Sequence, residues 1–188
     1  MARPRQDDVK RKILLATFDG VARSGVEGVS LRQIAREAGV STGTLTYHFT
    51  AMPQLILEAV DFGYRRLPAQ VEEMTFADKV EWALHRYVLD SDARRVWWRF
   101  WLSVISYAEE DSAVQSRITV LHRDLAEAWA TGLADGVRRG LYRSDLDVQA
   151  EAKRLSAFAH GLAVVQLADS GLVPWAAQEL DERLRGLR

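Results

Sequence analysis

The chain has 188 residues, of which 48% are hydrophobic and 27% charged, and its net charge at pH 7 is −1. These values are ordinary for a globular protein with a sizeable core. Cysteine is absent, which excludes disulfides, thiolate metal sites and cysteine nucleophiles. No signal-peptide pattern is present near the start, and no apolar run reaches the ~18 residues that span a bilayer. We therefore expect a cytoplasmic protein that does not insert into a membrane.

Charge is distributed unevenly along the chain. Residues 1–52 carry eight Lys or Arg and five Asp or Glu residues, a net charge of +3, whereas the remainder carries −4. A basic N-terminal segment attached to an acidic body is expected when only the first segment faces nucleic acid. The asymmetry is modest, and alone it decides little.

The first predicted helix spans residues 8–24, and two short helices follow it within residues 30–49. Ser30 and Ser41 are residue types that cap helix N-termini, and Gly39 can adopt the left-handed conformation of a sharp turn. Apolar residues at three- and four-residue spacing give the short helices a buried face: Leu31, Ile34, Ala35, Ala38, Leu45 and Phe49. Two capped helices joined by a glycine turn indicate a helix-turn-helix.

The second short helix presents polar side chains opposite its buried edge. Hydroxyls, an amphipathic ring and an imidazole can donate to phosphates, or contact base edges and thymine methyl groups. These outward residues are Thr42, Thr44, Thr46, Tyr47 and His48. A polar surface helix without a ligand is the alternative for any single short helix. We predict that residues 1–52 form a three-helix, helix-turn-helix DNA-binding domain.

The same segment resembles the N-terminal domain of the TetR/AcrR family of bacterial transcriptional regulators, in the runs IAREAGVS (34–41), GTL (43–45) and YHF (47–49). The remainder is similar mainly in length and helical pattern, with some likeness to the betaine-regulator-type members. The resemblance implies a dimeric repressor that leaves its operator when a ligand binds. Carried over position by position, it implies DNA contacts from Arg32, Thr42, Thr44, Thr46, Tyr47 and His48.

Two residues depart from the family's pattern. Thr46 stands where the family usually has an aromatic residue, so a short hydroxyl replaces one phosphate-contacting ring. Met52 stands where the family commonly has a lysine after the recognition helix. Loss of that lysine removes one phosphate contact per protomer, which should lower affinity and reduce the salt dependence by about one unit per contact.

The run GVSTG at 39–43 also matches the G-x-S-x-G pattern of a hydrolase nucleophile elbow. That elbow requires a buried strand before the serine, whereas the residues before Ser41 form an amphipathic helix. A helical hydrolase using Ser41 is therefore the alternative of another class, and we expect no enzymatic activity, no catalytic residue and no cofactor.

From residue 53 onward the apolar spacing predicts helices only, so the expected fold class is all-α. Residues 53–188 are predicted to form a helical regulatory domain for ligand binding and dimerisation. Its predicted helices lie at about 53–67, 75–89, 93–109, 112–139, 146–170 and 174–187. The helix that begins at Pro53 borders the recognition helix and enters the regulatory domain. We expect a shift of this helix to be the switch.

Residues 96–108, VWWRFWLSVISYA, are apolar on nearly every face of a helix. Such a helix is buried among others, and it is the predicted wall of an internal cavity. An aromatic lining would suit a flat apolar effector, or a cation held by cation–π attraction. The predicted ligand-binding residues are Trp98, Trp101, His122 and Trp129. Solid core is the alternative for each tryptophan.

Other polar residues in the helical body carry weaker signals. His85, His122 and His160 lack the spacing of metal ligands, so no metal is expected. Gln166 lies among apolar residues and could serve either the pocket or a dimer seam.

Small residues recur at three- and four-residue spacing in the helix at 146–170, and leucines line the last helix. This pattern predicts a two-helix surface that pairs with its symmetry mate as a four-helix bundle. The predicted dimerisation residues are Ser156, Ala159, Ala163, Leu180 and Leu184. Close packing of these residues within one subunit is the alternative.

These patterns predict a homodimeric transcriptional regulator that binds a pseudo-palindromic DNA operator. The expected mode of action is repression, relieved by a small-molecule effector that is apolar, aromatic or cationic. An activator, or an effector-independent DNA-binding protein with the same N-terminal domain, is the alternative.

Overall fold

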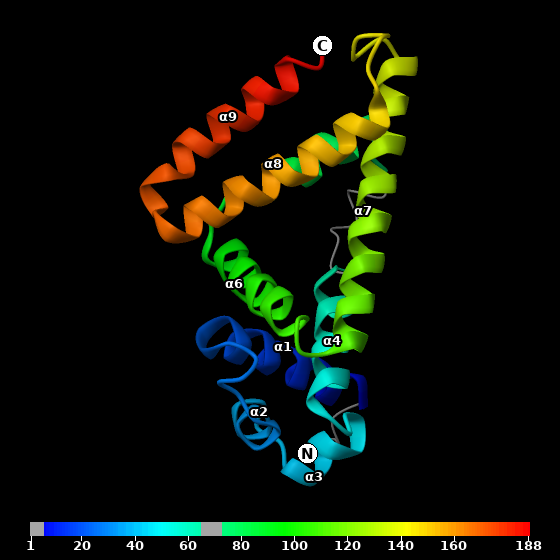
Figure 1. Cartoon of the computed structure of the whole chain (residues 1–188). Helices are drawn as coiled ribbons and strands as arrows, with labels where there is room; N and C mark the ends of the chain where they lie inside the picture. Colours follow the sequence, from blue (N-terminus) through cyan, green and yellow to red (C-terminus); the bar gives the residue numbers. More distant parts are fainter. Residues whose placement is uncertain (1–5, 65–72) are drawn as a thin grey trace. The chain divides into compact units, whose positions relative to one another are not determined.

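The computed structural model describes residues 6–64 and 73–188 (Figure 1). Across these two ranges the chain forms nine α-helices, one short 3₁₀ helix and no β-strand. The predicted all-α fold class is confirmed. The predicted end of the helix that begins near Pro53 lies outside the described residues. None of the helices within the described ranges combines the length and apolarity needed to cross a membrane.

The chain divides into two compact units. The first unit consists of Met1–Arg66 and Val96–Thr119, and the second of Leu67–Arg95 and Val120–Arg188. Two helices contribute residues to both units, α6 (Asp92–Tyr107) and α7 (Ser112–Arg138). The functional division of the chain after residue 52 stays a prediction.

The first unit contains the predicted helix-turn-helix (Figure 1). Its N-terminal helices are α1 (Gln6–Ser24), α2 (Leu31–Glu37), α3 (Thr42–His48) and α4 (Met52–Tyr64). Helix α1 packs against α2 and α4, and α2 packs against α3. Apolar side chains without exposed surface form the core of these four helices: Ile13, Ile34, Leu45, Phe49, Leu55 and Ile56.

The helix ends in this unit follow from local hydrogen bonds. The Ser30 hydroxyl accepts from the backbone N–H of Gln33 at 3.2 Å, and the Ser41 hydroxyl accepts from that of Thr44 at 3.0 Å. Both bonds satisfy N–H groups that the first turn of a helix leaves without a partner. Gly39 has a φ of 68°, where a side chain would be strained. The predicted caps and turn are confirmed.

The aromatic run of α6 packs inside the first unit rather than around an open space. Phe18 of α1 stacks on Phe100 and Trp97, with ring centroids 4.0 and 5.5 Å apart. Tyr64 of α4 meets Trp97 and Trp101 edge-on, at 5.3 and 5.6 Å. Edge-on and offset contacts are the favourable geometries for aromatic pairs. These rings therefore join α6 to α1 and α4.

The second unit contains the remaining helices, α5 (Phe76–His85), α8 (Val148–Ala168), the 3₁₀ helix Ser170–Leu172 and α9 (Val173–Arg185), with residues 120–138 of α7. One core cluster draws side chains from α5, α7, α8 and α9, among them Leu84, Trp129, Leu133, Leu155, Ala159 and Leu180. Helices α8 and α9 therefore bury apolar faces in the core of the second unit.

Two buried polar side chains are satisfied within the second unit. Glu151 accepts hydrogen bonds from Arg154 and Arg183, so its negative charge is compensated inside the fold. Gln166 accepts from the backbone N–H of Leu89 at 2.8 Å and donates to the carbonyl of Tyr87 at 2.9 Å. Gln166 is fully buried and therefore holds the segment after α5 against α8.

Candidate functional site

Helix α3 turns one edge inward and offers the rest of its surface to solvent. Leu45 and the following Phe49 are fully buried, whereas Tyr47 is 75% exposed. Thr42 and Thr46 are exposed as well, and Thr44 and His48 are partly exposed. The side chains predicted to face DNA therefore all reach the surface.

Two hydroxyls of α3 are already engaged in hydrogen bonds. Thr46 Oγ1 donates to the backbone carbonyls of Thr42 and Gly43, at 3.1 and 3.2 Å. Thr44 Oγ1 lies 2.8 Å from the hydroxyl oxygen of Ser41, so one of these two hydroxyls donates a hydrogen bond to the other. Because its own proton is used within the helix, Thr46 presents chiefly its methyl group and an acceptor oxygen to a partner.

Tyr47 and His48 form the aromatic end of this surface. Their ring centroids are 5.2 Å apart and the rings are nearly perpendicular. The amide of Gln6, at the start of α1, donates to the Tyr47 hydroxyl at 3.5 Å. Both rings can therefore reach a partner beside α3, with α1 close to one of them.

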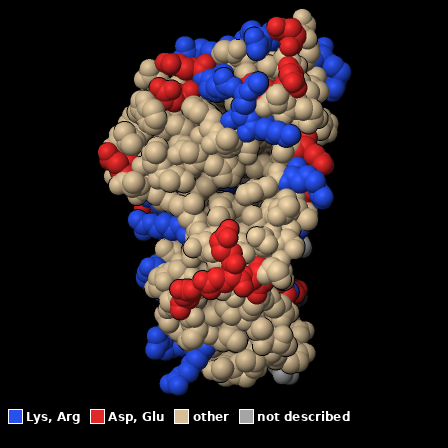
Figure 2. Space-filling view, in the orientation of Figure 1, with Lys and Arg blue, Asp and Glu red and all other residues tan. Residues whose placement is uncertain are grey.

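Between the two short helices, the positive charge belongs to α2, because residues 38–57 contain no Lys, Arg, Asp or Glu. Arg32 and Arg36 stand one helical turn apart and are both exposed. With Ser30 and Gln33 they line a hollow of about 440 Å³. Figure 2 shows Lys and Arg side chains at the edge of the end that carries α2 and α3. Arg36 is not among the residues that the sequence predicts to face DNA, and its four-residue spacing from Arg32 is the signal that could have added it.

The acidic residue nearest to these arginines in the sequence is neutralised by a partner on α1. Arg23 donates to both carboxylate oxygens of Glu37, at 2.9 and 2.8 Å. The hydrogen bonds from Arg23 and then from Gln33 lower the pKa of Glu37. The carboxylate is thus held in an ion pair with Arg23 beside Arg36.

Contacts with α6 and α7 fix the helix-turn-helix within the first unit. The backbone N–H of Val26, in the loop after α1, donates to the Ser103 hydroxyl of α6 at 2.9 Å. Asp61 of α4 accepts two hydrogen bonds from Arg117 of α7. The loop and α4 are therefore tied to segments that lie far along the chain.

The four predicted ligand-binding residues do not gather in one place. Trp98 and Trp101 are buried in the first unit, and His122 and Trp129 belong to the second. Trp129 is buried in the core cluster, where its indole N–H has no hydrogen-bond partner among the residues that the structure describes. Among the four, His122 alone lines a described hollow. Burial of the three tryptophans agrees with the solid-core alternative.

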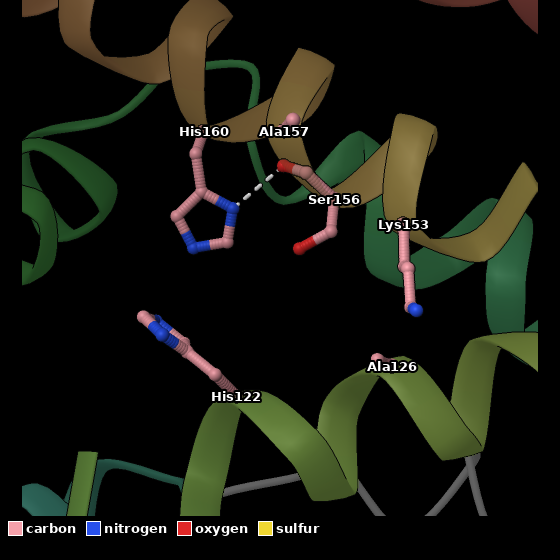
Figure 3. A pocket seen from close by; sticks show the side chains of 6 residues that line it. All are labelled: His122, Ala126, Lys153, Ser156, Ala157 and His160. Carbon is pink, nitrogen blue, oxygen red and sulfur yellow. Dashed lines mark hydrogen bonds between the residues drawn. The ribbon is translucent and has the colours of Figure 1, made fainter. Parts of the chain in front are cut away.

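A second hollow of about 330 Å³ lies between α7 and α8 (Figure 3). It is lined by His122, Ala126, Lys153, Ser156, Ala157 and His160. The rings of His122 and His160 meet edge to face, with centroids 5.6 Å apart. Burial lowers the pKa of both imidazoles, and for His160 a hydrogen bond with the Ser156 carbonyl opposes this effect. No residue spacing indicates this pair, because His122 lies on α7 and His160 on α8.

Aromatic contacts connect this hollow with the core of the second unit. The Tyr87 ring meets His160 at 5.2 Å and Trp129 at 5.8 Å, both edge-on. The Tyr87 ring therefore connects His160 with Trp129 in the core cluster. Within the described ranges no group of three His, Asp or Glu residues is arranged to hold a metal ion.

The predicted dimerisation residues are largely internal. Ala159, Ala163 and Leu180 have no exposed surface, and Leu184 is almost fully buried. Ser156 is partly buried and lines the hollow beside α7. The burial of the two alanines and the two leucines agrees with the alternative of close packing within one subunit, and the dimerisation role of these residues stays a prediction. The small-residue spacing reflects contacts with α9 and the core.

A different face of α8 and α9 is apolar and exposed. Val164 is 43% and Val165 39% exposed on α8, and Trp175 is 45% exposed on α9. Gly161 is exposed on α8, and a Cβ added there would meet nothing within 4 Å. This face has room for another helix to approach closely.

Ser41, the residue of the alternative hydrolase reading, caps α3 and follows α2 rather than a strand. Its hydroxyl accepts from Thr44 and lies beside the Thr44 hydroxyl. A nucleophile elbow needs a strand before the serine, so the geometry contradicts that alternative.

Comparison with known proteins gives two family matches. Residues 13–59 match the family described as bacterial regulatory proteins, tetR family. Residues 76–185 match the family described as BetI-type transcriptional repressor, C-terminal. Together the matches cover the helix-turn-helix with the start of α4, and α5 to α9.

Individual relatives agree with these matches. The HTH-type transcriptional regulator PksA of Bacillus subtilis is 25% identical, over 88% of this chain and 83% of that protein. A TetR transcription regulator from Haloarcula marismortui has the same fold, with a TM-score of 0.81 at 18% identity over 96% of this chain and 98% of that one. A transcriptional regulator from Saccharomonospora viridis in complex with choline has a TM-score of 0.83 at 23% identity, over 95% and 96% of the two chains.

Proposed function

We propose that this protein, which belongs to the TetR family of bacterial transcriptional regulators, is a dimeric repressor that a small-molecule effector releases from a pseudo-palindromic operator. The family consists of non-enzymatic DNA-binding proteins, so the chain is a regulator rather than an enzyme. The observation that carries the proposal is the surface of α3, where exposed polar groups stand beside the two arginines of α2.

The two helices would divide the work of DNA binding. Neutral side chains of α3 would contact base edges in the major groove, because hydrogen bonds and methyl contacts distinguish bases there. The arginines of α2 would contact phosphates, which fix orientation without reading sequence. The proposed DNA contacts are Arg32, Thr42, Thr44, Thr46, Tyr47 and His48, with Arg36 added from the structure. Thr46 would act through its methyl group, since its proton is donated within α3.

A dimer would bring two such surfaces to one operator. A single short helix contacts few bases, whereas two related by a twofold axis can read half-sites ~34 Å or a multiple apart. The exposed apolar face of α8 and α9 supports this assembly through Val164, Val165 and Trp175. Gly161 would allow close approach of the partner's helix. This face replaces the buried residues that the small-residue pattern indicated.

The effector would act by changing the spacing of the two DNA-binding surfaces. A ligand shifts an equilibrium only if it binds one conformation more tightly than the other. The hollow between α7 and α8 is our candidate for the effector site, and its volume suits a small molecule. The regulator from Saccharomonospora viridis, which has the same fold, is in complex with choline, and this supports a small-molecule effector for the present protein. The domains proposed are residues 1–52 for DNA and 53–188 for regulation, in a cytoplasmic protein.

An activator, or a DNA-binding protein that needs no effector, would use the same α2 and α3 surface. Transcription in vitro from a template carrying the operator separates these functions. A repressor lowers transcript yield as protein is added, and an effector restores it. A rise in transcript with added protein would indicate an activator. Repression that no candidate effector relieves, over a panel of cationic, anionic and neutral small molecules, would favour the effector-independent function.

A further inference from the structure

Thr46 is an exposed residue of α3 whose hydroxyl group is bonded to its own helix. Its Oγ1 donates to the backbone carbonyls of Thr42 and Gly43, at 3.1 and 3.2 Å, so both acceptors of the preceding turn share its one proton. A base acceptor such as guanine O6 or thymine O4 could receive that proton only if these hydrogen bonds were broken. Thr46 is therefore poorly suited to donate a hydrogen bond to a base.

The same hydrogen bonds hold the Thr46 side chain in one direction. A threonine in a helix divides between two χ1 rotamers, and a hydroxyl bonded to the preceding turn selects between them. The methyl group is bonded to the same Cβ as the hydroxyl, so its direction is fixed together with that of Oγ1. Because the rotamer is already set in the free protein, a contact made by this methyl group costs little side-chain entropy.

Two buried neighbours keep Thr46 at the surface of the unit. Leu45 and Phe49 have no exposed surface, and their packing in the core fixes how α3 is rotated about its own axis. Tyr47, the next residue after Thr46, is 75% exposed. The methyl group of Thr46 thus belongs to the same outward surface as the Tyr47 ring.

The composition of α3 limits how this helix can distinguish bases. Its sequence, TGTLTYH, contains no Arg, Lys, Asn or Gln, the residues that form paired hydrogen bonds with guanine or adenine in the major groove. Single hydrogen bonds and apolar contacts remain available to α3. The apolar group that a base pair presents in the major groove is the 5-methyl group of thymine.

From the fixed rotamer and the composition of α3, we infer that the Thr46 methyl group recognises the 5-methyl group of one thymine in each half-site of the operator. This inference rests on the proposed function, because it requires α3 to enter the major groove. Burial of one methyl group against another predicts that each half-site loses about fourfold in affinity when the thymine lacks its methyl group.

Uracil substitution of the operator tests the inference. The probes are duplexes with the sequence selected from random DNA, in which each thymine of the half-site is replaced in turn by deoxyuridine. Uracil pairs with adenine as thymine does and lacks only the 5-methyl group. Fluorescence anisotropy should find one position at which the full-length protein binds about fourfold more weakly per half-site. The absence of any such position would overturn the inference.

A second duplex with cytosine paired to guanine at that position tests the other group that Thr46 exposes. Its Oγ1 retains an acceptor site, which could receive a hydrogen bond from the amino group of cytosine. The inference predicts weaker binding of cytosine than of thymine, because cytosine has no 5-methyl group. Tighter binding of cytosine would show that Thr46 reads an amino group instead, and would also overturn the inference.

Variants of Thr46 assign the sensitive thymine to this side chain. Thr46→Ser removes the methyl group and keeps the hydroxyl, so this protein should bind the thymine and uracil duplexes equally. Thr46→Val keeps a methyl group and removes the hydroxyl, so it should still prefer thymine. Thr131→Ser is the matched control, because Thr131 is an exposed threonine of α7 in the second unit whose hydroxyl also donates to a carbonyl of the preceding turn.

Thermal melting shows whether each variant is folded. Thr131→Ser should keep the wild-type preference for thymine over uracil at every position. If folded Thr46→Ser protein discriminates between thymine and uracil as strongly as the wild type, the methyl group of Thr46 does not make the contact.

The same measurements distinguish this inference from the proposed function. If the wild-type protein selects an operator but no thymine in it depends on Thr46, the proposed function stands and the inference fails. If the wild-type protein selects no duplex sequence at low salt, the proposed function fails, and the inference fails with it.

Discussion

Asp61 in α4 accepts hydrogen bonds from Nε and Nη2 of Arg117 in α7, at 3.0 and 2.5 Å. Both side chains are only partly exposed, so solvent screens this pair less than a surface pair. The contact joins the helix after the DNA-binding surface to a segment more than fifty residues away in the sequence. It is therefore a physical link through which α4 is held in place.

Arg117→Gln should loosen that link. We expect the free energy of unfolding to fall by ~0.5–1 kcal/mol, because one partly exposed ion pair is lost. We also expect a changed response of operator affinity to effector, since α4 is freed from α7. Chemical denaturation and fluorescence anisotropy with labelled operator measure the two effects. Arg123→Gln removes an exposed pair on the same helix and serves as control. If operator affinity responds to effector identically in the two variants, the Asp61–Arg117 ion pair does not connect effector binding with DNA binding.

Arg36→Ala should weaken DNA binding similarly for all sequences. The loss of one phosphate contact per protomer predicts that the slope of log affinity against log salt falls by about two per dimer. Arg32→Ala should behave alike, and Arg185→Ala, an exposed arginine at the end of α9, should not. Salt titrations of operator affinity measure the slopes. A slope unchanged in Arg36→Ala would show that this arginine does not contact DNA.

Tyr47→Ala should lower operator affinity by ~1–3 kcal/mol without changing the oligomeric state, because the ring is exposed on α3 and outside the core. Tyr47→Phe retains the ring and shows how much of the effect belongs to the hydroxyl that Gln6 contacts. Anisotropy measures the affinity and sedimentation velocity the assembly. Wild-type affinity in Tyr47→Ala would exclude the residue from the interface.

Gly161→Glu should separate the dimer, because it places a charge in the exposed apolar face of α8 where a partner helix would approach. Ala159→Leu should instead destabilise each subunit by ~1–3 kcal/mol, since that position is fully buried. Ala113→Glu, at an exposed position near the start of α7, is the charge control. An intact dimer in Gly161→Glu at micromolar concentration would place the seam elsewhere.

Stability should decrease as the pH falls below the ordinary histidine pKa of 6.5. Burial lowers the pKa of His122 and His160, so the folded chain binds protons more weakly than the unfolded chain. The contribution of the two neutral histidines to the free energy of unfolding is fully present above pH 6.5. It is lost as the pH falls toward the lowered pKa values of His122 and His160. Urea denaturation between pH 5 and 8 measures it, and a His122→Gln, His160→Gln double variant should show a smaller decrease. An equal decrease in the double variant would assign it to other groups.

The helix-turn-helix could be predicted from the sequence because its determinants are local. Ser30, Ser41 and Gly39 fix helix ends through bonds within a few residues, and the four-residue spacing of Leu45 and Phe49 fixes the buried edge. Local chemistry of this kind depends little on the rest of the chain.

Features that depend on how helices pack could not be predicted in this way. Ala159 and Ala163 show that small residues indicate close approach without showing whether the neighbour is α9 or a partner subunit. The imidazoles of His122 and His160 meet because α7 and α8 pack together, and no spacing rule connects them. Likewise, an apolar run such as that of α6 predicts burial but cannot distinguish a cavity wall from packing against Phe18.

Selection of bound fragments from random duplex DNA shows whether α3 reads DNA, because it examines binding, symmetry and spacing together. We expect enrichment of a pseudo-palindrome with half-sites one helical turn, or a multiple of a turn, apart. We also expect the Tyr47→Ala protein to enrich that sequence poorly. No enrichment by the wild-type protein at low salt, or equal enrichment by the two proteins, would contradict the assignment of α3 as the helix that reads DNA.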